Sequence, residues 1–471
     1  MLSLSPFFSS AYHRTPVPVR NLFASTYSLW SDKMKYGGKY EEWRTLLEKS
    51  QWWDNHRLRD YQVAQLSKLA MFVYEHCQYY HARMEEAGIT PTSIDSIESV
   101  KRLPIIDKSD VRANHGGIRT HLGSSRTLTL YTSGTTGTAL RVPMTRETFQ
   151  REYAFRWQFQ SVASAKRGDR FAYFTGHHLF MPERSRTPFW IRNYPANSIM
   201  FSLYHMAEST LGEYLKALNA FGPLYVSGYP SGIYLLAAYA LDKGLRIQPP
   251  RAVFTASEKL HRHQRDAIQR GFGAPVYEWY GQVETTGNLQ ECEHHRLHIK
   301  EEYGLLEILK GDGSDALPGE TGHVVATGWG NKAFPLVRYR TGDNMILAED
   351  QSCPCGRGGR IVKEILGRDE DFVVTPEGRF VGRLDFVFKS VSTVKESQIV
   401  QENEHTICVK VVPLENYSTR DEQLIVNMLR ERVGGSMTVY VEKVSEIPRQ
   451  QNGKIRYVIS RVPQSLTRQK M

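Results

Sequence analysis

Cysteine is scarce in this sequence, which has five among 471 residues. They are Cys77, Cys292, Cys353, Cys355 and Cys408. An odd and low number in a chain of this length excludes a framework of disulfide bonds as the basis of the fold. A reducing compartment fits this usage, and we therefore expect the protein to be cytoplasmic.

The sequence also lacks an apolar segment suited to crossing a membrane. Its longest run without a charged residue, residues 217–241, contains two prolines and three glycines, which would break a spanning helix. We expect instead a buried strand, a turn near Tyr229 and Pro230, and a core helix over about residues 232–241. The Ser-rich start, whose first acid is Asp32, superficially resembles a transit peptide. It has no apolar core of the signal-peptide type, so a native N-terminal arm is expected.

Neither low-complexity tracts nor fixed-period repeats occur. The content of 41% hydrophobic and 11% aromatic residues is typical of a folded protein, and the length allows roughly two to four domains. The net charge of +10 is compatible with a nucleic-acid or membrane-surface binder. The basic residues are spread out, however, and no zinc finger or RNA-binding signature is present. A cleft for anionic ligands therefore explains the charge at least as well as a nucleic-acid partner does.

The order of expected elements indicates an α/β fold. Residues 40–90 show helical periodicity, and residues 103–114 read as a turn followed by a short capped helix. Farther along, the strand-like "RAVFTA" and "PVYEWYG" flank the helical "HRHQRDAIQRGFG". This strand–helix–strand alternation predicts a largely parallel sheet.

Two changes of pattern divide the rest of the chain. After Glu301, short strands alternate with Gly-rich turns, which predicts a β-rich subdomain over about residues 301–366. The charged segment "GRDED" at 367–371 then precedes a smaller α+β pattern. We therefore predict a large N-terminal domain, 1–368, and a small C-terminal domain, 369–471.

The segment "YTSGTTGTAL" at 131–140 concentrates five Ser and Thr hydroxyls and two glycines between two apolar-rich runs. Glycines allow a tight turn whose backbone N–H groups form an anion-binding concavity, and the hydroxyls add donors. The segment is not a Walker A loop, because Thr138 and Ala139 follow its last glycine. A phosphate cradle and an ordinary surface loop both remain open at this point.

Three charged residues stand at expected turns. Glu284 in "WYGQVETTG" follows a strand and is a carboxylate of the kind that holds Mg²⁺ beside substrate phosphates. Asp343 in "RYRTGDN" is placed to accept both hydroxyls of a ribose, and Lys454 follows the tight turn Asn452-Gly453. Each has an ordinary alternative, namely a solvated loop acid, a turn-capping aspartate and a solvent-exposed lysine.

Soft metal ligands occur in two short segments. "ECEHHRLH" contains Cys292, His294, His295 and His298, and "CPCGRGG" contains Cys353 and Cys355. Three thiolates and one imidazole suit tetrahedral Zn²⁺, although the Cys-x-Cys spacing is tighter than the usual one. The alternative is free cysteines beside surface histidines.

Taken in order, "YTSGTTG", "WYGQVE", "YRTGD", "GRDED" and "PRQQNGK" resemble the motif set of the adenylate-forming enzymes. "LPIIDKSDVR", "SGYPS", "NKAFPLVRYRTGD" and "CPCGRGGRIVKEILGR" resemble the phenylacetate–coenzyme A ligase family. Within that family the sequence is most similar to the capsular polysaccharide (CapK-like) branch. The resemblance extends from about Trp43 to Ser460.

The resemblance implies a function for each matching residue. The ATP phosphates would bind the hydroxyl–glycine loop, which consists of Thr132, Ser133, Gly134, Thr135, Thr136 and Gly137. The adenosine part would contact Ser257, Glu258, Tyr280, Gly281 and Asp343, and Arg368 would lie near the ribose or the phosphates. Glu284 would hold Mg²⁺, Lys454 would be the catalytic lysine of a mobile C-terminal domain, and a structural Zn²⁺ would bind Cys292, His298, Cys353 and Cys355.

Four residues depart from the family pattern. Ala139 and Leu140 replace a common proline and lysine, with Arg141 next as a substitute charge. Val283 stands where a threonine is frequent, directly before the expected magnesium ligand Glu284, and Glu370 replaces an aspartate of the hinge.

We expect a ligase that converts a carboxylic acid, aromatic or related, into an acyl-adenylate and then a coenzyme A thioester. An amine acceptor such as an amino sugar, a silent nucleotide-binding scaffold and a basic nucleic-acid binder are the alternatives. The oligomeric state stays open.

Overall fold

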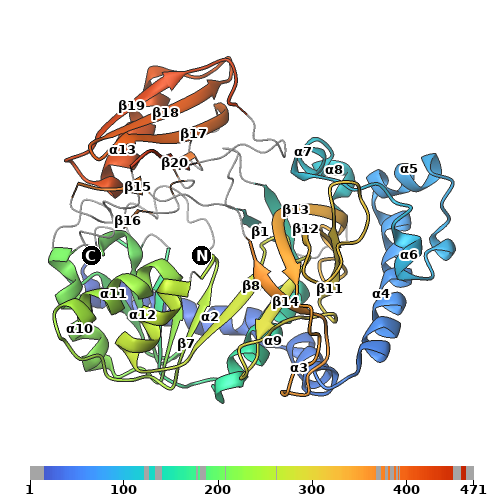
Figure 1. The fold of residues 1–471 in the computed structure, drawn as a ribbon, viewed down its shortest axis with the longest axis horizontal. Coiled ribbons are helices and arrows are strands. Elements are labelled where there is room, and N and C mark those ends of the chain that lie inside the picture. Colours follow the sequence, from blue (N-terminus) through green and yellow to red (C-terminus); the bar gives the residue numbers. More distant parts are fainter. Residues whose placement is uncertain are drawn as a thin grey trace. The chain divides into compact units, whose positions relative to one another are not determined.

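The computed structural model describes residues 15–120, 127–132, 140–176, 179–180, 187–206, 208–260, 262–366, 373–376, 380–381, 384, 387–388, 391, 393–448 and 458–462. The chain forms two compact units (Figure 1). The first comprises Met1–Leu130 and Val142–Leu366, and the second comprises Tyr131–Arg141 and Gly367–Met471.

The first unit begins with helices. They are α2 (Val17–Lys35), α3 (Gly38–Ser50), α4 (Asn55–His76), α5 (Gln78–Glu86), η1 (Pro91–Ser93), α6 (Ile97–Val100), α7 (Lys108–Ala113) and α8 (His115–Ile118). The helical periodicity of residues 40–90 is thereby confirmed. The capped helix is confirmed too, because the Asp107 carboxylate accepts hydrogen bonds from the backbone N–H groups of Ser109 and Asp110 at the start of α7. Helix α2 lies in the expected N-terminal arm.

A sheet of twelve strands forms the centre of the first unit, in the order β11-β12-β13-β14-β10-β9-β8-β7-β6-β3-β5-β4. Its strands are β3 (Phe171–Thr175), β4 (Trp190–Asn193), β5 (Ser198–Ser202), β6 (Tyr225–Gly228), β7 (Ala252–Ala256), β8 (Val276–Gly281), β9 (Asn288–Glu291), β10 (Leu297–Ile299), β11 (Gly304–Leu309), β12 (Thr321–Gly328), β13 (Leu336–Leu347) and β14 (Ile361–Ile365). A separate two-stranded sheet pairs β1 (Leu128–Tyr131) with β2 (Arg141–Met144).

The α/β class is confirmed, but the sheet is mixed rather than largely parallel. Strands β5, β3, β6, β7 and β8 are parallel neighbours. From β9 to β14, and at the edge strand β4, the pairing is antiparallel. The β-rich part expected over 301–366 therefore continues the same sheet.

Four helices pack with the parallel half of the sheet. They are α9 (Arg146–Gln160), α10 (Glu208–Phe221), α11 (Pro230–Asp242) and α12 (Arg262–Phe272). The expected strand, turn and core helix of residues 217–241 correspond to β6, Tyr229 and α11. Helix α11 buries Ile233, Leu236 and Ala237 in the main hydrophobic core, which explains its uncharged sequence.

The second unit contains a four-stranded sheet in the order β19-β18-β17-β20. Its elements are β17 (Val394–Asn403), β18 (Thr406–Pro413), α13 (Thr419–Val433), β19 (Thr438–Lys443) and β20 (Val458–Ser460). A short pair joins β15 (Val373–Val374) to β16 (Phe380–Val381). Helix α13 buries Ile425, Leu429 and Val433 against the sheet core, as its apolar periodicity predicts.

The structure corrects the local setting of Asp343, which was expected at a turn. Asp343 lies inside the twelve-residue strand β13. Gly342 adopts φ +88°, and the pairing with β12 shifts register at this level. A bulge therefore absorbs the Gly-containing segment, and the strand continues through it.

Among the described residues, no helix combines the length and apolar character that a membrane crossing needs.

Candidate nucleotide and metal sites

The C-terminal ends of β7 and β8 bring four predicted residues to one edge of the sheet. Ala256 and Trp279 are register partners in these parallel strands. Ser257 and Glu258 follow β7 directly, while Tyr280 and Gly281 end β8. In open α/β sheets this edge is where ligands bind. The Glu258 carboxylate accepts a 3.2 Å hydrogen bond from the backbone N–H of Ser231, near the start of α11.

Tyr280 and Asp343 are in direct contact. The Tyr280 hydroxyl donates a 2.7 Å hydrogen bond to Oδ2 of Asp343, and the Gln282 amide lies 3.3 Å from the same oxygen. Asp343 is 8% exposed. Tyr280 and Asp343 are 63 positions apart in the sequence, and the hydrogen bond brings them together. The ordered motifs predicted that these two residues belong to the same site.

Glu284 lies on the connection between β8 and β9 and is also largely buried. Its Oε1 accepts a 3.2 Å hydrogen bond from the hydroxyl of Tyr339, four residues before Asp343 on β13. The next residue, Thr285, has φ +56° and a buried hydroxyl without a hydrogen-bond partner in the structure. Strand β13 therefore links both predicted acids, Asp343 directly and Glu284 through Tyr339.

The hydroxyl–glycine loop is described only at its margins. The backbone N–H of Thr132 donates to the Leu140 carbonyl, and the Thr132 hydroxyl accepts from the Leu140 N–H, both at 3.0 Å. These bonds close the two ends of the segment. Ser133, Gly134, Thr135, Thr136 and Gly137 lie outside the described residues, as do Arg368 and Lys454.

The predicted metal ligands converge. The ligand atoms of Cys292, His298, Cys353 and Cys355 all lie within 4.8 Å of one another. The Sγ atoms of Cys292 and Cys353 are 3.6 Å apart, and Cys355 Sγ is 3.5 Å from His298 Nε2. Tetrahedral Zn²⁺ with its usual bond lengths requires about 3.8 Å between two sulfurs and about 3.6 Å between sulfur and nitrogen. The four residues therefore fit a zinc ion.

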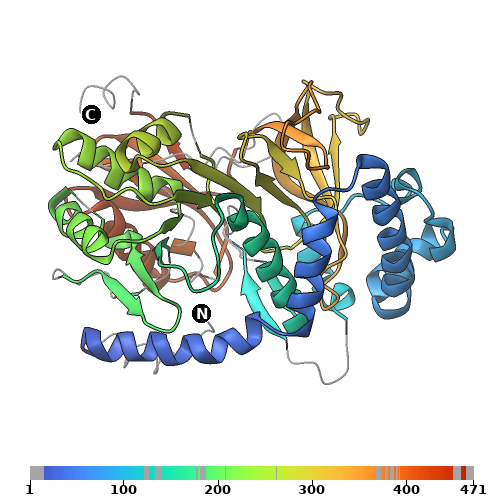
Figure 2. The same ribbon diagram turned by 90° about the horizontal axis from the view of Figure 1, so that it is seen from below.

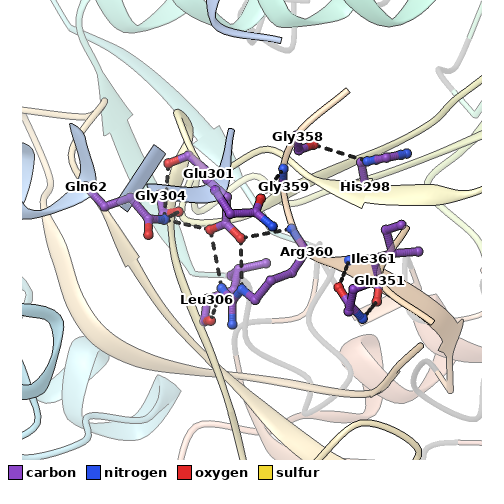
Figure 3. Close-up of polar contacts among 11 residues, drawn as sticks. Gln62, His298, Glu301, Gly304, Leu306, Gln351, Gly358, Gly359, Arg360 and Ile361 are labelled. Carbon is purple, nitrogen blue, oxygen red and sulfur yellow. Dashed lines mark hydrogen bonds and ion pairs between the residues drawn. The ribbon is translucent and has the colours of Figure 1, made fainter. Parts of the chain in front are cut away.

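Surrounding contacts hold this cluster in place (Figure 3). His298 Nδ1 lies 3.1 Å from the Gly358 carbonyl, an arrangement that directs Nε2 to the cluster. Near Gly358, the Arg360 guanidinium contacts the Glu301 carboxylate at 2.8 Å, and the Gln62 amide donates to the same carboxylate at 2.7 Å. The strand β10 and the loop before β14 are thus fixed to each other and to helix α4.

Burial shifts the pKa values of two of the predicted ligands, His298 and Cys292. Burial lowers the pKa of His298 to about 4, so its imidazole is neutral and able to coordinate at neutral pH. Burial also raises the pKa of the Cys292 thiol to about 12. A divalent cation would compensate the cost of the buried thiolate that coordination requires.

Sequence reasoning missed Gln282 and Tyr339, which contact Asp343 and Glu284 respectively. Both lie inside the motifs "WYGQVE" and "YRTGD", so their proximity to the site was available from the sequence. Their hydrogen-bond partners could not be predicted from the sequence, because these depend on how the segments pack in the folded sheet. The Gly358 carbonyl beside His298 was likewise not foreseen.

Comparison with known proteins shows which families this chain is similar to. Residues 373–461 match the family model of the CapK C-terminal domain. Protein CapK of Staphylococcus aureus is 25% identical over 458 residues, which cover 96% of this chain and 99% of the relative. A phenylacetate-coenzyme A ligase of Thermus thermophilus is 24% identical over 437 residues, covering 86% and 96%.

Solved structures support the fold. A 2-hydroxyisobutyryl-CoA ligase in complex with 2-HIB-AMP and CoA superposes with a TM-score of 0.63, at 18% identity, over 90% of this chain and 94% of that chain. An open conformation of this ligase gives a TM-score of 0.51. The chain is thus homologous over nearly its full length to Protein CapK and to acid–CoA ligases, and it has the fold of an adenylate-forming ligase. The predicted resemblance is confirmed.

Proposed function

We propose that this homologue of Protein CapK and of the phenylacetate-coenzyme A ligases is an ATP-dependent, carboxylate-activating ligase. The 2.7 Å contact between Tyr280 and Asp343 carries the proposal, because it assembles two distant family motifs at the ligand-binding edge of the sheet. The homologous ligases make coenzyme A thioesters the first expectation for the product.

Each part of ATP would have its own contacts in this arrangement. The Asp343 carboxylate, oriented by Tyr280 and Gln282, would accept hydrogen bonds from the ribose hydroxyls. The backbone at Ser257, Glu258 and Gly281 would line the adenine. The loop that Thr132 begins would bind the phosphates through backbone N–H groups and hydroxyls, and Arg368 would contact the ribose or the phosphates.

Adenylation would form one oxygen–phosphorus bond and break another. A carboxylate oxygen of the acid attacks the α-phosphorus of ATP, and pyrophosphate leaves with the bonding electrons. Both reactants are anions, so the barrier is largely positional and electrostatic. Glu284, oriented by Tyr339, would hold Mg²⁺, which neutralises phosphate charge when bound.

Transfer of the acyl group would then replace the acyl–oxygen bond to AMP by an acyl–sulfur bond to coenzyme A. The coenzyme A thiolate attacks the acyl carbon, and AMP leaves as the carbon–oxygen bond breaks. Lys454 would stabilise the charge that develops during adenylation and would withdraw before transfer, as the C-terminal unit moves about residues 368–371. The acyl-adenylate must be shielded from water between the two steps.

Zinc would serve structure rather than chemistry. Cys292 directly follows β9 and His298 lies in β10, while Cys353 and Cys355 lie between β13 and β14. An ion held by these four residues would cross-link two segments that are about sixty residues apart, as the 61-residue separation of Cys292 and Cys353 indicates. That link would stabilise the strands that lead to Asp343.

The acceptor is the part of the proposal that needs its own experiment. The enzyme is incubated with ATP, Mg²⁺ and a panel of aryl and aliphatic acids, with coenzyme A or with amines that include amino sugars. A thioester product identified by mass spectrometry supports the proposal. An amide product with no thioester would replace coenzyme A by an amine and place the chain with the amide-forming alternative.

A further inference from the structure

Arg156 of helix α9 is half-buried, yet no acidic side chain pairs with it. Its guanidinium carbon lies 5.4 Å from the centroid of the Tyr173 ring and 5.9 Å from that of the Tyr153 ring. Among the described residues, no carboxylate forms an ion pair with this guanidinium. Arg151, earlier on the same helix, is fully buried and contacts the Glu152 carboxylate at 3.3 Å. Arg156 thus has aromatic neighbours where Arg151 has an acid.

The charge of Arg156 is not compensated by its aromatic neighbours. Burial acts to lower the pKa of Arg156, and Tyr173, Tyr153 and Tyr36 act to raise it, so that the pKa stays above its usual value and the side chain is charged. The face of an aromatic ring attracts a cation but carries no net charge. Burying a charge without an ionic partner costs free energy. An anion in contact with this guanidinium would supply the missing partner.

Two more cations lie on the same group of tyrosines. Lys35 Nζ is 5.3 Å from the centroid of the Tyr153 ring, and the Arg167 guanidinium carbon is 3.9 Å from that of Tyr36. Both cations contact the Asp32 carboxylate, at 3.5 and 3.6 Å. Since this acid is shared by two cations already, the unpaired guanidinium beside them makes the local charge positive, which favours a negatively charged ligand.

Helix α9 runs along the sheet in a known direction. It lies beside α3 and near the end of α2 (Figure 2). Just after the helix, the Ala163 carbonyl accepts a 3.0 Å hydrogen bond from the hydroxyl of Tyr225, the first residue of β6. The helix therefore ends near the N-terminal ends of the parallel strands, and its earlier turns extend toward their C-terminal ends.

The sheet-facing side of this helix reaches the strand that carries Tyr280. Phe159, which follows Arg156 by three residues and so shares its face of the helix, packs against Trp279 with ring centroids 5.3 Å apart. Trp279 directly precedes Tyr280 at the end of β8. Tyr173 lies two residues before the end of β3. The Arg156 guanidinium is therefore between α9 and the sheet, near the edge where ligands of open α/β sheets bind.

We propose that Arg156 binds a second carboxylate of the acid that the enzyme activates, so that the substrate is a dicarboxylic acid. The inference rests on the proposed function and names the substrate class for it. A guanidinium binds a carboxylate through two parallel hydrogen bonds, and the phenol hydroxyls of Tyr153 and Tyr173 can donate others. One carboxylate of the substrate would face ATP and the other would face Arg156. An acid with an uncharged tail would leave the guanidinium without a partner, which is the basis for discrimination.

The test compares acids of similar shape that differ in the second carboxylate: succinate with butyrate, glutarate with pentanoate, and terephthalate with para-toluate. ATP–pyrophosphate exchange gives kcat/KM for each acid, and calorimetry with and without AMP gives its affinity. The proposal expects the wild type to favour at least one dicarboxylate over its partner. Arg156→Gln should lower kcat/KM and affinity for that dicarboxylate at least about thirtyfold, and change those for the matched monocarboxylate by less than about threefold.

Two further variants separate binding from structure. Arg270→Gln removes one positive charge from the exposed side of α12 and is the matched control, which should behave as the wild type. Arg156→Lys keeps the charge without the planar fork, and it should retain part of the preference for the dicarboxylate. Because Arg156→Gln breaks no ion pair of the described structure, its Tm without ligand should match that of the wild type.

Two results would overturn the proposal. One is a wild type that does not favour the dicarboxylate of any pair, in exchange or in affinity. The other is a preference for a dicarboxylate that Arg156→Gln leaves unchanged. Failure of the proposed function is a different result, in which no acid supports exchange. If the wild type then still binds a dicarboxylate and Arg156→Gln does not, the carboxylate site at Arg156 is supported and the ligase activity is not.

Discussion

The hydroxyl of Tyr280 donates a hydrogen bond to the carboxylate of Asp343, at 2.7 Å. Tyr280 ends a strand of the parallel half of the sheet, and Asp343 lies on a strand of the antiparallel half. The contact therefore ties the two halves together at the proposed ATP site. It fixes the orientation of a carboxylate whose geometry decides whether it can accept two hydroxyls at once.

Replacing Tyr280 by phenylalanine is expected to weaken ATP binding. The variant removes one hydrogen bond to a charged group, which contributes about 1.5–3 kcal/mol, so KM for ATP should rise about tenfold or more. Asp343→Ala should have the larger effect, because the acceptor itself is lost. Glu349→Gln is the control, since that side chain is 74% exposed and lies just after the end of β13. KM values for ATP unchanged in both site variants would exclude Asp343 as the ribose ligand.

The Cys–His cluster predicts one tightly held zinc per chain. Cys353→Ser should abolish zinc binding, measured by elemental analysis of the purified protein, and lower Tm by about 5 °C or more. Chelation of the wild type should produce the same loss of Tm. Cys408→Ser is the matched control for metal content, because Cys408 is a buried cysteine of the second unit. Full zinc content in Cys353→Ser would refute the assignment.

Glu278 predicts a pH dependence of stability. Burial raises its pKa to about 7, with a further contribution from the neighbouring Glu291 charge, while Arg265 opposes the shift. Since the unfolded value is about 4.3, the folded state keeps a proton that the unfolded state releases. The stability that the protonated Glu278 carboxyl contributes is fully present below the unfolded pKa of about 4.3. It is lost as the pH rises through the folded pKa of about 7.

Glu278→Gln should therefore stabilise the protein at alkaline pH and have little effect under acidic conditions. The expected gain at about pH 8 is on the order of 2 kcal/mol in the free energy of unfolding, and it should vanish below about pH 4. Urea denaturation of the variant and wild type at both pH values measures the difference. Glu364→Gln, at a half-exposed carboxylate, is the control and should show no such change. An equal effect of Glu278→Gln at both pH values would contradict the shift.

The sequence predicted well those elements whose boundaries are determined by residues close together in the chain. Asp107 caps α7 because its carboxylate satisfies two free N–H groups, a signal contained within four residues. The uncharged run of residues 217–241 contains the end of α10, strand β6 and most of α11, and its prolines and glycines lie at or near the boundaries between these elements. Residue type marked the two Cys- and His-containing segments as a candidate metal site, and the family resemblance selected His298 among their histidines; the structure brings the four selected residues together.

What sequence did not predict depends on register and on packing between distant segments. The bulge at Gly342, which keeps Asp343 within a strand, follows from its pairing with β12. The antiparallel half of the sheet joined the parallel half because β9 pairs with β8, a choice that hydrophobic alternation does not reveal. The contacts of α2 likewise depend on packing: the Asn21 and Ser25 side chains accept hydrogen bonds from the backbone N–H groups of Arg192 and Tyr194, and the sequence does not reveal these partners.

Carboxylate-dependent exchange of pyrophosphate into ATP tests the central claim most directly. The wild-type chain is assayed with a panel of aryl, aliphatic and amino acids, alongside Lys454→Ala and the control Lys443→Ala, a surface lysine of β19. The account predicts exchange with at least one acid, retained in Lys443→Ala and reduced at least about a hundredfold in Lys454→Ala. It also predicts that Lys454→Ala still transfers the acyl group from a supplied acyl-adenylate. Exchange that persists in Lys454→Ala, or its absence across the whole panel when ATP binds, would contradict the account.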